Sequence, residues 1–474
     1  MAQVQNLLEA AAGALSSPTL AVAVSDRAGN PLGVYRRPGA TNVEEETALG
    51  LARTGAFFSN NQAPLTSRTV RFVSGIHFPP GVPNTPNAAL YGIENTNRGC
   101  DLNVTWNQGK ELPRATALNG LPCNPFDASG CGTGPVTGKA DNMDSDFAAV
   151  NPGGIPIFQG PTLVGGLGIA GVGPRAAEGG AFQAVMATTG LSPLPPLPLP
   201  VPGVVFIDGI RLPSFKFSAP PDGSGPGNFA DGTVSLGPFH GKCAPDGYLV
   251  GPTGGSQLSQ AEVERIVQQS RDVAERTRAV IRLPLGSRAR MVIAVSDLGG
   301  NILAIFRMVD ATVFSVDVAV AKARNVIYFS DPGSGGHLDM PGIPAGTAVT
   351  NRTINFGSQP LFPPGIDGKA FGEIERGPFL DLYVNDLANP CSQGSEPAHL
   401  NQNGVVFFAG AIPLYRGGQL VGGLGISGDG VEQDDYVSLL GAEGFLPPDN
   451  LRADRVKIDG VRLPFLKFPR NPEE

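Results

Sequence analysis

The chain has 474 residues, of which 41% are hydrophobic and 16% charged, and its net charge is −8. This composition is that of a globular protein of two or three domains, and no run of Lys and Arg offers a track for nucleic-acid phosphates. No apolar stretch is long enough to span a bilayer, since the apolar segment LSPLPPLPLPVPGVV is too rich in proline to form a helix. We therefore expect a soluble protein without a nucleic-acid partner.

The N-terminus, MAQVQNLLEAAAGAL, lacks the basic start and apolar core of a secretory signal. We expect a protein that is cytoplasmic, or exported after trimming. The five cysteines, Cys100, Cys123, Cys131, Cys243 and Cys391, show no CxxC spacing. One or two disulfides in an exported form are therefore favoured over a zinc site, and the odd count leaves at least one thiol unpaired within the monomer.

An internal repeat runs through the chain. LAVAVSDRAGNPLGVYRRPGA at 20–40 matches MVIAVSDLGGNILAIFRMVDA at 291–311. Later in the chain IDGIRLPSFKF at 207–217 matches IDGVRLPFLKF at 458–468, and the segments HFPPGV and LVGGLGIAG recur between them as LFPPGI and LVGGLGISG. Self-similarity of this length and order predicts two homologous domains.

We place these domains at 1–218 and 256–474, joined by a Pro/Gly-rich linker at 219–255. The changing spacing between matched segments indicates about 13 extra residues in the second repeat, around DPGSGGHLDMPG. The first repeat has about 27 extra residues in a region that contains Cys123 and Cys131.

The two repeats show the same order of elements. In the second, a helix opens with a Ser259-x-x-Glu262 capping box and is followed by the strands MVIAVSD and ILAIFRM. A helix, VDVAVAKARNVIYF, comes next, and the strands GAIPLYR and QLVGGLGISG follow an irregular region. The order αββα-insertion-ββ predicts an α/β fold class, with each domain an antiparallel sheet flanked by helices.

The segment LVGGLGIAG contains Gly166-x-Gly168-x-x-Gly171, the glycine spacing of a dinucleotide-binding loop. Such a loop must open a helix, because the helix N-terminus holds the pyrophosphate. This segment leads into VGPRAAEGGAF and is predicted to pair back onto GIPIFQ, so we do not expect a nucleotide site. Glycines within a strand mark instead a bulge, or a place where another chain or a flat ligand presses against the backbone.

The ordered motifs IAVSDLGGNILAIFRMVDA, VAVAKARN and GAIPLYRGGQLVGGLGISGDGVEQDD resemble the GlcG/HbpS family of haem-binding or haem-degrading domains. The resemblance covers most of 256–445 and, more loosely, 5–175. It implies haem, or another small flat ligand, as the bound molecule, and assembly as a homo-oligomer or an intramolecular pseudo-dimer. The positions that carry the family pattern in the second repeat are Asp297, Gly300, Arg307, Lys322, Arg324, Gly422, Gly423, Gly425, Ser427 and Gly428.

The first repeat departs from this pattern. Arg53 matches Arg324, but Leu51 stands where the lysine is expected and Ala170 stands where Ser427 is expected. If Lys322 helps to hold an anionic group of the ligand, the first domain has lost that contact. The alternative for the arginines is structural, since long cations on helices and strand ends commonly pair with nearby carboxylates.

Candidate metal ligands are few. Haem iron accepts His, Cys, Met or Tyr, and His337 and His77 are the histidines that we consider as axial ligands, although His337 lies in a glycine-rich loop where a solvated histidine is the commoner finding. The segment DNMDSD places three carboxylates together and could hold calcium, without the spacing of an EF-hand. Its carboxylates are those of Asp141, Asp144 and Asp146.

Three hypotheses follow for the function. The first is a haem-binding or haem-associated protein of the GlcG/HbpS type. The second is a non-catalytic structural module that keeps the fold for packing in an assembly. The third is an enzyme that acts on a small molecule, for which no nucleophile elbow, zinc helix or P-loop motif names catalytic residues.

Overall fold

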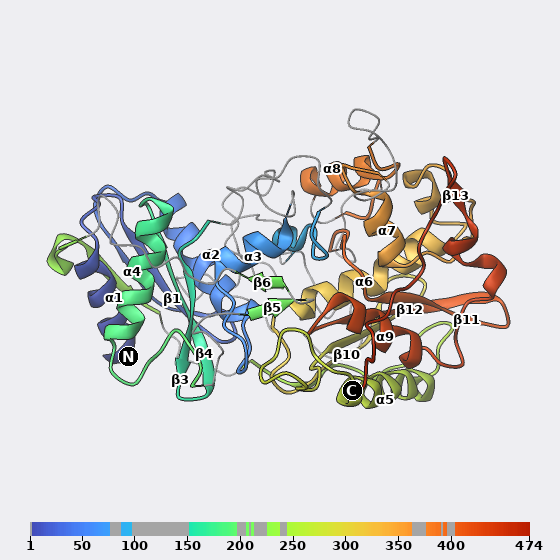
Figure 1. The fold of residues 1–474 in the computed structure, drawn as a ribbon, viewed down its shortest axis with the longest axis horizontal. Coiled ribbons are helices and arrows are strands. Elements are labelled where there is room, and N and C mark those ends of the chain that lie inside the picture. Colours follow the sequence, from blue (N-terminus) through green and yellow to red (C-terminus); the bar gives the residue numbers. More distant parts are fainter. Residues whose placement is uncertain are drawn as a thin grey trace.

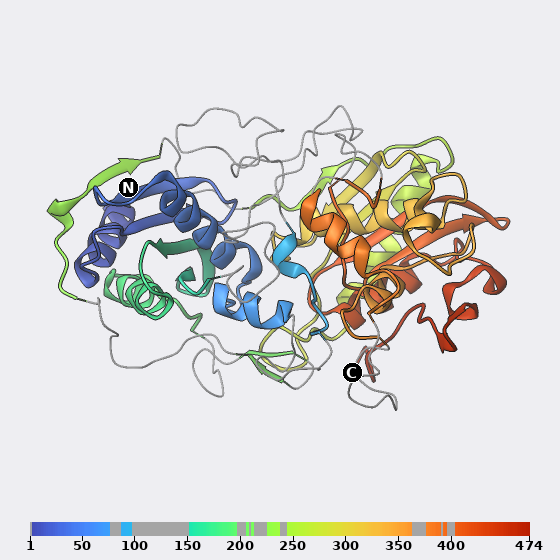
Figure 2. The ribbon, with the colours of Figure 1, turned by 90° about the horizontal axis from the view of Figure 1, so that it is seen from above.

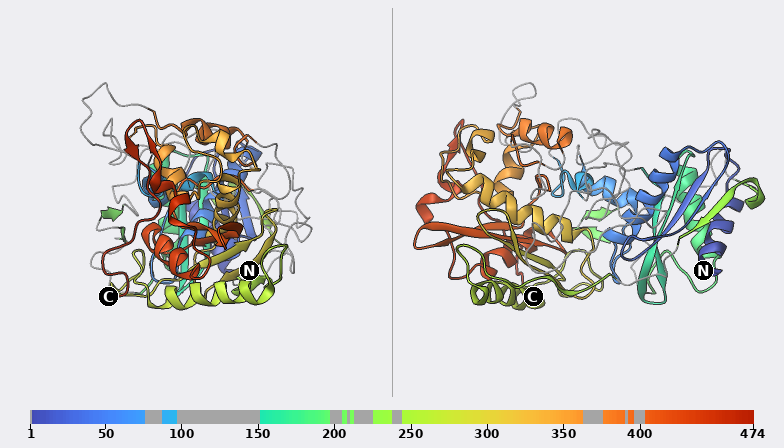
Figure 3. Two further views of the ribbon diagram at one scale, coloured as in Figure 1. Left: turned by 90° about the vertical axis from the view of Figure 1, so that its right-hand side faces the viewer. Right: turned by 180° about the vertical axis from the view of Figure 1, so that it is seen from behind.

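The computed structural model places the two halves of the chain side by side along the long axis of the molecule (Figure 1, Figure 2). Each half has its own sheet, and helices lie against it (Figure 3). The structure describes residues 2–75, 87–96, 151–196, 205–207, 210–212, 225–237, 244–362, 376–389, 392–395 and 403–474. Within these residues no helix is long and apolar enough to cross a membrane.

The two sheets are five-stranded, antiparallel and built in the same order. The first has the order β3-β4-β1-β2-β7 and the second the order β11-β12-β9-β10-β8. The strands of the first are β1 (Ala21–Asp26), β2 (Pro31–Arg36), β3 (Gly154–Gln159), β4 (Thr162–Ala170) and β7 (Thr233–Leu236). Those of the second are β8 (Gly247–Val250), β9 (Val292–Ser296), β10 (Ile302–Arg307), β11 (Ala411–Arg416) and β12 (Gln419–Ser427). The predicted fold class is confirmed, and the shared order supports the duplication.

The range 219–255, which we expected to be a linker, contributes to both sheets. Strand β7 pairs with β2, and strand β8 pairs with β10, so each sheet gains an edge strand from this range. The domain boundaries stay predictions.

Helices cover both faces of each sheet. The α-helices of the first half are α1 (Ala2–Ala14), α2 (Asn42–Phe58), α3 (Ser67–Ser74) and α4 (Pro174–Ala187). Those of the second half are α5 (Gln260–Arg276), α6 (Ser315–Ser330), α7 (Asn351–Gly357), α8 (Leu380–Ala388) and α9 (Val431–Gly441). Short 3-10 turns lie at η1 (Ile93–Asn95), η2 (Phe229–Asp231), η3 (Gly336–Asp339), η4 (Asp449–Leu451) and η5 (Ala453–Arg455).

The predicted order of elements missed one helix in each half. Helix α4 follows β4 and helix α9 follows β12, whereas VGPRAAEGGAF had been expected to continue without a helix. The segment VGPRAAEGGAF was not assigned to a helix because it contains three glycines and a proline. Pro174, however, stands at the start of α4, where proline is well tolerated. The strand therefore does lead into a helix, and this ground for rejecting a nucleotide loop was wrong.

Alternation along β1 explains the two layers of helices. Val22 and Val24 pack with α1 and α4 on one face, while Ala21 and Ala23 pack with α2 on the other. Successive side chains of a strand point to opposite faces, so a strand buried on both sides needs apolar residues at every position.

The repeated IDGxRLP segments form hairpins separate from the two main sheets. In the first half β5 (Val205–Ile207) pairs with β6 (Ile210–Leu212), and in the second half β13 (Lys457–Ile458) pairs with β14 (Val461–Arg462).

The repeated glycines let one helix lie directly against the sheet. A Cβ on Gly166 would lie 1.9 Å from the carbonyl oxygen of Ala52, and a Cβ on Gly168 would lie 2.0 Å from that of Ala48, both on α2. On the equivalent helix α6, Gly423 and Gly425 meet the carbonyl oxygens of Ala323 and Ala319 at 2.2 and 2.1 Å. The glycines therefore serve helix packing in both halves, and the face that they open is filled by the chain's own helix.

Replacement of Gly425 by alanine is expected to lower the free energy of unfolding by about 3 kcal/mol, because the new methyl group would collide with backbone atoms that cannot turn aside. Urea unfolding followed by circular dichroism measures the change. The control is Gly179→Ala in α4, where a Cβ meets nothing within 4 Å and where alanine should be neutral or slightly stabilising. Equal effects of the two variants would contradict the packing role.

Candidate functional site

Two motif arginines hold the turn between the first two strands of each sheet. The Nε of Arg324 donates to the carbonyl oxygen of Gly300 at 2.9 Å, and the Nε of Arg53 donates to that of Gly29 at 2.9 Å. Both side chains are buried, and burial lowers the pKa of Arg324 to about 9 and that of Arg53 to about 10. The same contact in both halves indicates a role in the fold that requires no ligand.

Arg307 also makes its described contacts within the protein. Its guanidinium donates to the carbonyl oxygens of Ala244 and Pro245 at 3.3 and 2.9 Å and to that of Ala311. These bonds fasten the segment before β8 to the end of β10. Its counterpart in the first half, Arg36, lies at the surface in an ion pair with Glu45.

Lys322 is fully buried on α6 and is paired with an acid that the sequence motifs had not named. Its Nζ lies 2.8 Å from the carbonyl oxygen of Ile426 and 3.0 Å from Oδ2 of Asp434, and it lies 4.9 Å from the ring centre of Phe408. Burial lowers the pKa of the lysine, and Asp434 opposes that shift. Burial likewise raises the pKa of Asp434, to about 7, against the opposing effect of Lys322.

The first half shows that this ion pair is not required by the fold. Leu51 and Ala177 occupy the equivalent positions, as the glycine before each hairpin confirms: a Cβ on Gly410 would approach Lys322 and Asp434, and a Cβ on Gly153 would approach Leu51 and Ala177. Both members of the pair are therefore replaced together by apolar residues in a domain of the same topology.

A neighbouring ion pair, in contrast, is present in both halves. Arg352 pairs with the buried Asp435, and at the equivalent place Arg68 pairs with the buried Glu178 through two bonds of 2.6 and 2.8 Å. This pair is retained in both halves, where it joins α3 to α4 and α7 to α9. Such retention is expected of a structural contact. The Lys322–Asp434 pair differs from it in belonging to one half alone.

Asp434 lines a small apolar cavity at the junction of the two halves. Phe58, Leu65 and Ile93 of the first half face Phe314, Phe408 and Ser427 of the second across it. The rings of Phe58 and Phe314 are stacked, with centroids 4.3 Å apart. The volume of about 30 Å³ is enough for roughly two water molecules. We refer to this space, together with Lys322 and Asp434, as the junction site.

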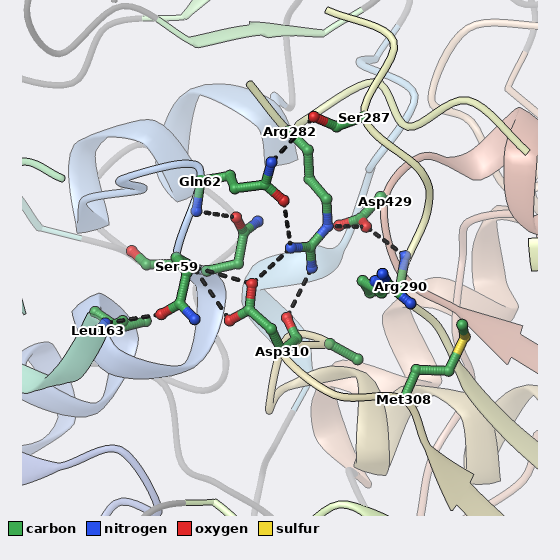
Figure 4. Close-up of polar contacts among 12 residues, drawn as sticks. Ser59, Gln62, Leu163, Arg282, Ser287, Arg290, Met308, Asp310 and Asp429 are labelled. Atoms are coloured by element: carbon green, nitrogen blue, oxygen red, sulfur yellow. Dashed lines mark hydrogen bonds and ion pairs between the residues drawn. The ribbon is translucent and has the colours of Figure 1, made fainter. Parts of the chain in front are cut away.

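A polar cluster beside the junction site joins the two halves (Figure 4). The buried guanidinium of Arg282 pairs with Asp429 and, at 2.6 Å, with Asp310. From the first half, Gln62 Oε1 accepts from Arg282 at 3.3 Å, and the amide of Asn61 donates to the carboxylate of Asp310 at 3.1 Å. The end of α2 is thereby fixed to the second domain.

The remaining predicted site residues lie apart from the junction site or outside the described residues. His337 lies on η3, next to Gly336, which packs on the backbone of Tyr328 near the end of α6. Its Nδ1 is buried without a hydrogen-bond partner. His77, the proposed calcium ligands Asp141, Asp144 and Asp146, and all five cysteines lie outside the described residues. Within the described ranges no group of three or more His, Cys, Asp or Glu is placed to hold a metal ion.

The motif glycines have packing roles in the fold, whereas Ser427 lies at the junction site. Gly422, like Gly423 and Gly425, opens a close approach, in its case to the carbonyl oxygen of Ser296 at 2.5 Å. The hydroxyl of Ser427 bonds that of Ser315 at 3.0 Å and lies in the cavity wall. Sequence reasoning noted the loss of Lys322 and Ser427 in the first repeat but missed Asp434. Alignment of α9 with its counterpart would have shown Asp434 opposite Ala177.

A double-mutant cycle on Lys322 and Asp434 tests whether the fold needs the pair. Lys322→Leu or Asp434→Ala alone leaves a buried group without its partner and should cost about 3 kcal/mol. The double variant reproduces the residues of the first half, so we expect it to return to within about 1 kcal/mol of the wild type in urea unfolding. The control cycle uses the partly exposed pair Arg416–Glu262, whose coupling should be below about 1 kcal/mol. Additive losses in the double variant would show that the pair is structural.

The stability of the protein should depend on pH through Asp434. Its pKa is about 7 in the folded protein against an ordinary value of 3.8, so the folded state holds the proton more tightly. The resulting stabilisation is complete below the unfolded pKa and is lost as the pH rises through the folded pKa. We expect the unfolding free energy of the wild type, relative to Asp434→Asn, to fall between about pH 4 and about pH 7. A constant difference across this range would contradict the shift.

Residues 258–443 match a family described as haem degrading protein HbpS-like. No curated protein matches the chain. Among solved structures, a PduOC:heme complex is 21% identical with a TM-score of 0.24, covering 40% of this chain and 94% of that one. The Klebsiella pneumoniae protein ORFY is 22% identical with a TM-score of 0.22, covering 38% of this chain and 87% of that one. The family match lies within the second half of the chain, and the first half repeats the strand order of the second.

Proposed function

We propose that this protein binds a small ligand between its two domains, at the junction site. The observation that carries the proposal is the exchange of Lys322 and Asp434 for Leu51 and Ala177 in the other half. A buried ion pair that apolar residues can replace in the same fold contributes little to the stability of that fold. The position of Asp434 in the wall of a cavity, with its pKa near neutrality, is typical of a functional site.

Association with haem is the second candidate, and the family description of residues 258–443 favours it. The described residues do not fit a haem in the junction site. The cavity has room for roughly two water molecules, and its described lining contains no His, Cys, Met or Tyr to ligate iron. Lys322, whose partner Asp434 lines the cavity, is already bonded to Asp434 and Ile426. We therefore derive no haem chemistry at this place, and His337 on η3 is the described candidate for a haem ligand elsewhere in the second domain.

The packing hypothesis accounts for the other motif residues. Arg53 and Arg324 hold turns, the glycines admit a helix, and Arg282 joins the domains. The contacts of Arg282 between the halves support an intramolecular pseudo-dimer, and a homo-oligomer stays a prediction. A purely structural module and a ligand-binding protein thus differ in what they require of Lys322 and Asp434. The enzyme hypothesis has one supporting feature, an acid with a pKa near 7 beside a buried lysine, which suits acid–base chemistry.

A haemin titration followed at the Soret band distinguishes the first two candidates. Wild type, the Lys322→Leu/Asp434→Ala double variant and His337→Ala are compared. We expect the wild type and the double variant to give the same curve, because the junction site does not admit haem. A saturable shift at one equivalent that the double variant abolishes would overturn this conclusion. A saturable shift that His337→Ala weakens would support haem association at η3, and no saturable shift would count against haem association.

A further inference from the structure

We infer that the ligand of the junction site is a small neutral molecule with a hydroxyl group, in the size range of a short-chain alcohol. This inference rests on the proposed function and specifies its ligand. It follows from three properties of the site: the unpartnered oxygen of Asp434, the neutral sum of the Lys322–Asp434 charges and the small apolar volume.

The first property is an available acceptor. Oδ2 of Asp434 is bonded to Lys322, but Oδ1 is buried and has no hydrogen-bond partner. A buried acceptor that stays unpaired costs free energy, so a ligand that donates a hydrogen bond to it gains more than the same bond would give in water. Asp434 is one of the residues that line the cavity, and the proposal is that its Oδ1 is the atom that meets the ligand.

The second property is charge. With Asp434 ionised, Lys322 and Asp434 together carry no net charge, and Lys322 has its described contacts with Ile426, Asp434 and the ring of Phe408. An anionic ligand would meet the carboxylate, and a cationic ligand would compete with the lysine for it. An anion would also lose its hydration among Phe58, Phe314 and Phe408, and a second cation beside the buried Lys322 would be repelled by its charge. A neutral donor avoids both costs.

The third property is the combination of size and polarity. A volume of about 30 Å³ admits a group of few heavy atoms. Ser427 and the start of α9 also border the cavity, and Gly430, which precedes α9, gives the first turn no side-chain cap. A hydroxyl both donates and accepts, so it can bond Oδ1 of Asp434 while its oxygen faces the amide end of this helix. The carbon atoms of the alcohol would lie against the phenylalanine rings.

The test uses the full-length protein, labelled at isoleucine and valine methyl groups, with methanol and ethanol as probes. We expect saturable shifts in the methyl signals of the cavity residues Ile93, Ile281 and Val431 in the wild type. The Lys322→Leu/Asp434→Ala variant should lose at least tenfold in affinity, while urea unfolding shows that it is folded. Arg416→Ala, remote from the cavity, should bind as the wild type does.

The outcomes separate the ligand class from the site. Saturable binding of sodium acetate or ethylammonium at these methyl groups, in place of the alcohols, would overturn the neutral ligand and leave the proposed site standing. Alcohol binding that the double variant keeps would overturn the role of the ion pair. A crystal structure grown with ethanol that shows only water in the cavity, together with no saturable shift for any probe, would overturn both inferences.

Discussion

The contact between a central helix and a glycine-bearing strand determines the architecture of both halves. Helices α2 and α6 approach the sheets so closely that the carbonyl oxygens of Ala48 and Ala319 occupy the space that a side chain on β4 or β12 would need. This proximity puts Lys322, in the middle of α6, against β12 and within reach of α9. A helix held further away could still cover the sheet, but its lysine would not be enclosed between the strand and the last helix.

The sequence predicted the repeat, the strands and the antiparallel sheets because each depends on local pattern: alternation, turn glycines and repeated order. For the glycines it left open a bulge or the approach of another chain or a flat ligand, whereas the structure brings the chain's own helix against them. The role of Asp434 could not be predicted from the sequence, because its pairing with Lys322 depends on how α9 packs after the hairpin. The short glycine-rich connection before α4 and α9 concealed those helices, so the acid that faces the lysine was not assigned to any element.

The two halves provide an internal comparison for the buried charges. Arg68–Glu178 and Arg352–Asp435 occupy the same place and differ by one methylene group in the acid, so this pair is part of how the domain packs. In the Lys322–Asp434 pair, the acid lies one residue before Asp435 on α9. Apolar residues replace both members of this pair in the other half. Buried pairs often contribute little to stability relative to apolar residues of similar volume, and the sister domain shows such a substitution within the same fold.

The junction contacts explain why the site exists in the second half alone. The halves meet with the end of α2 on the start of α6, so different surfaces of the repeated domain are in contact. The acids that bind Arg282 have no counterpart in the first half, where Gly39 and Val172 stand in place of Asp310 and Asp429. Phe314, covered by Phe58, corresponds to the exposed Val43. Among the described residues of the first half, the equivalent place is an open hollow bordered by Glu44, Gly171 and Ala176. The docking of the first domain on Phe314 and Arg282 therefore forms the junction site, at which we propose that a ligand binds.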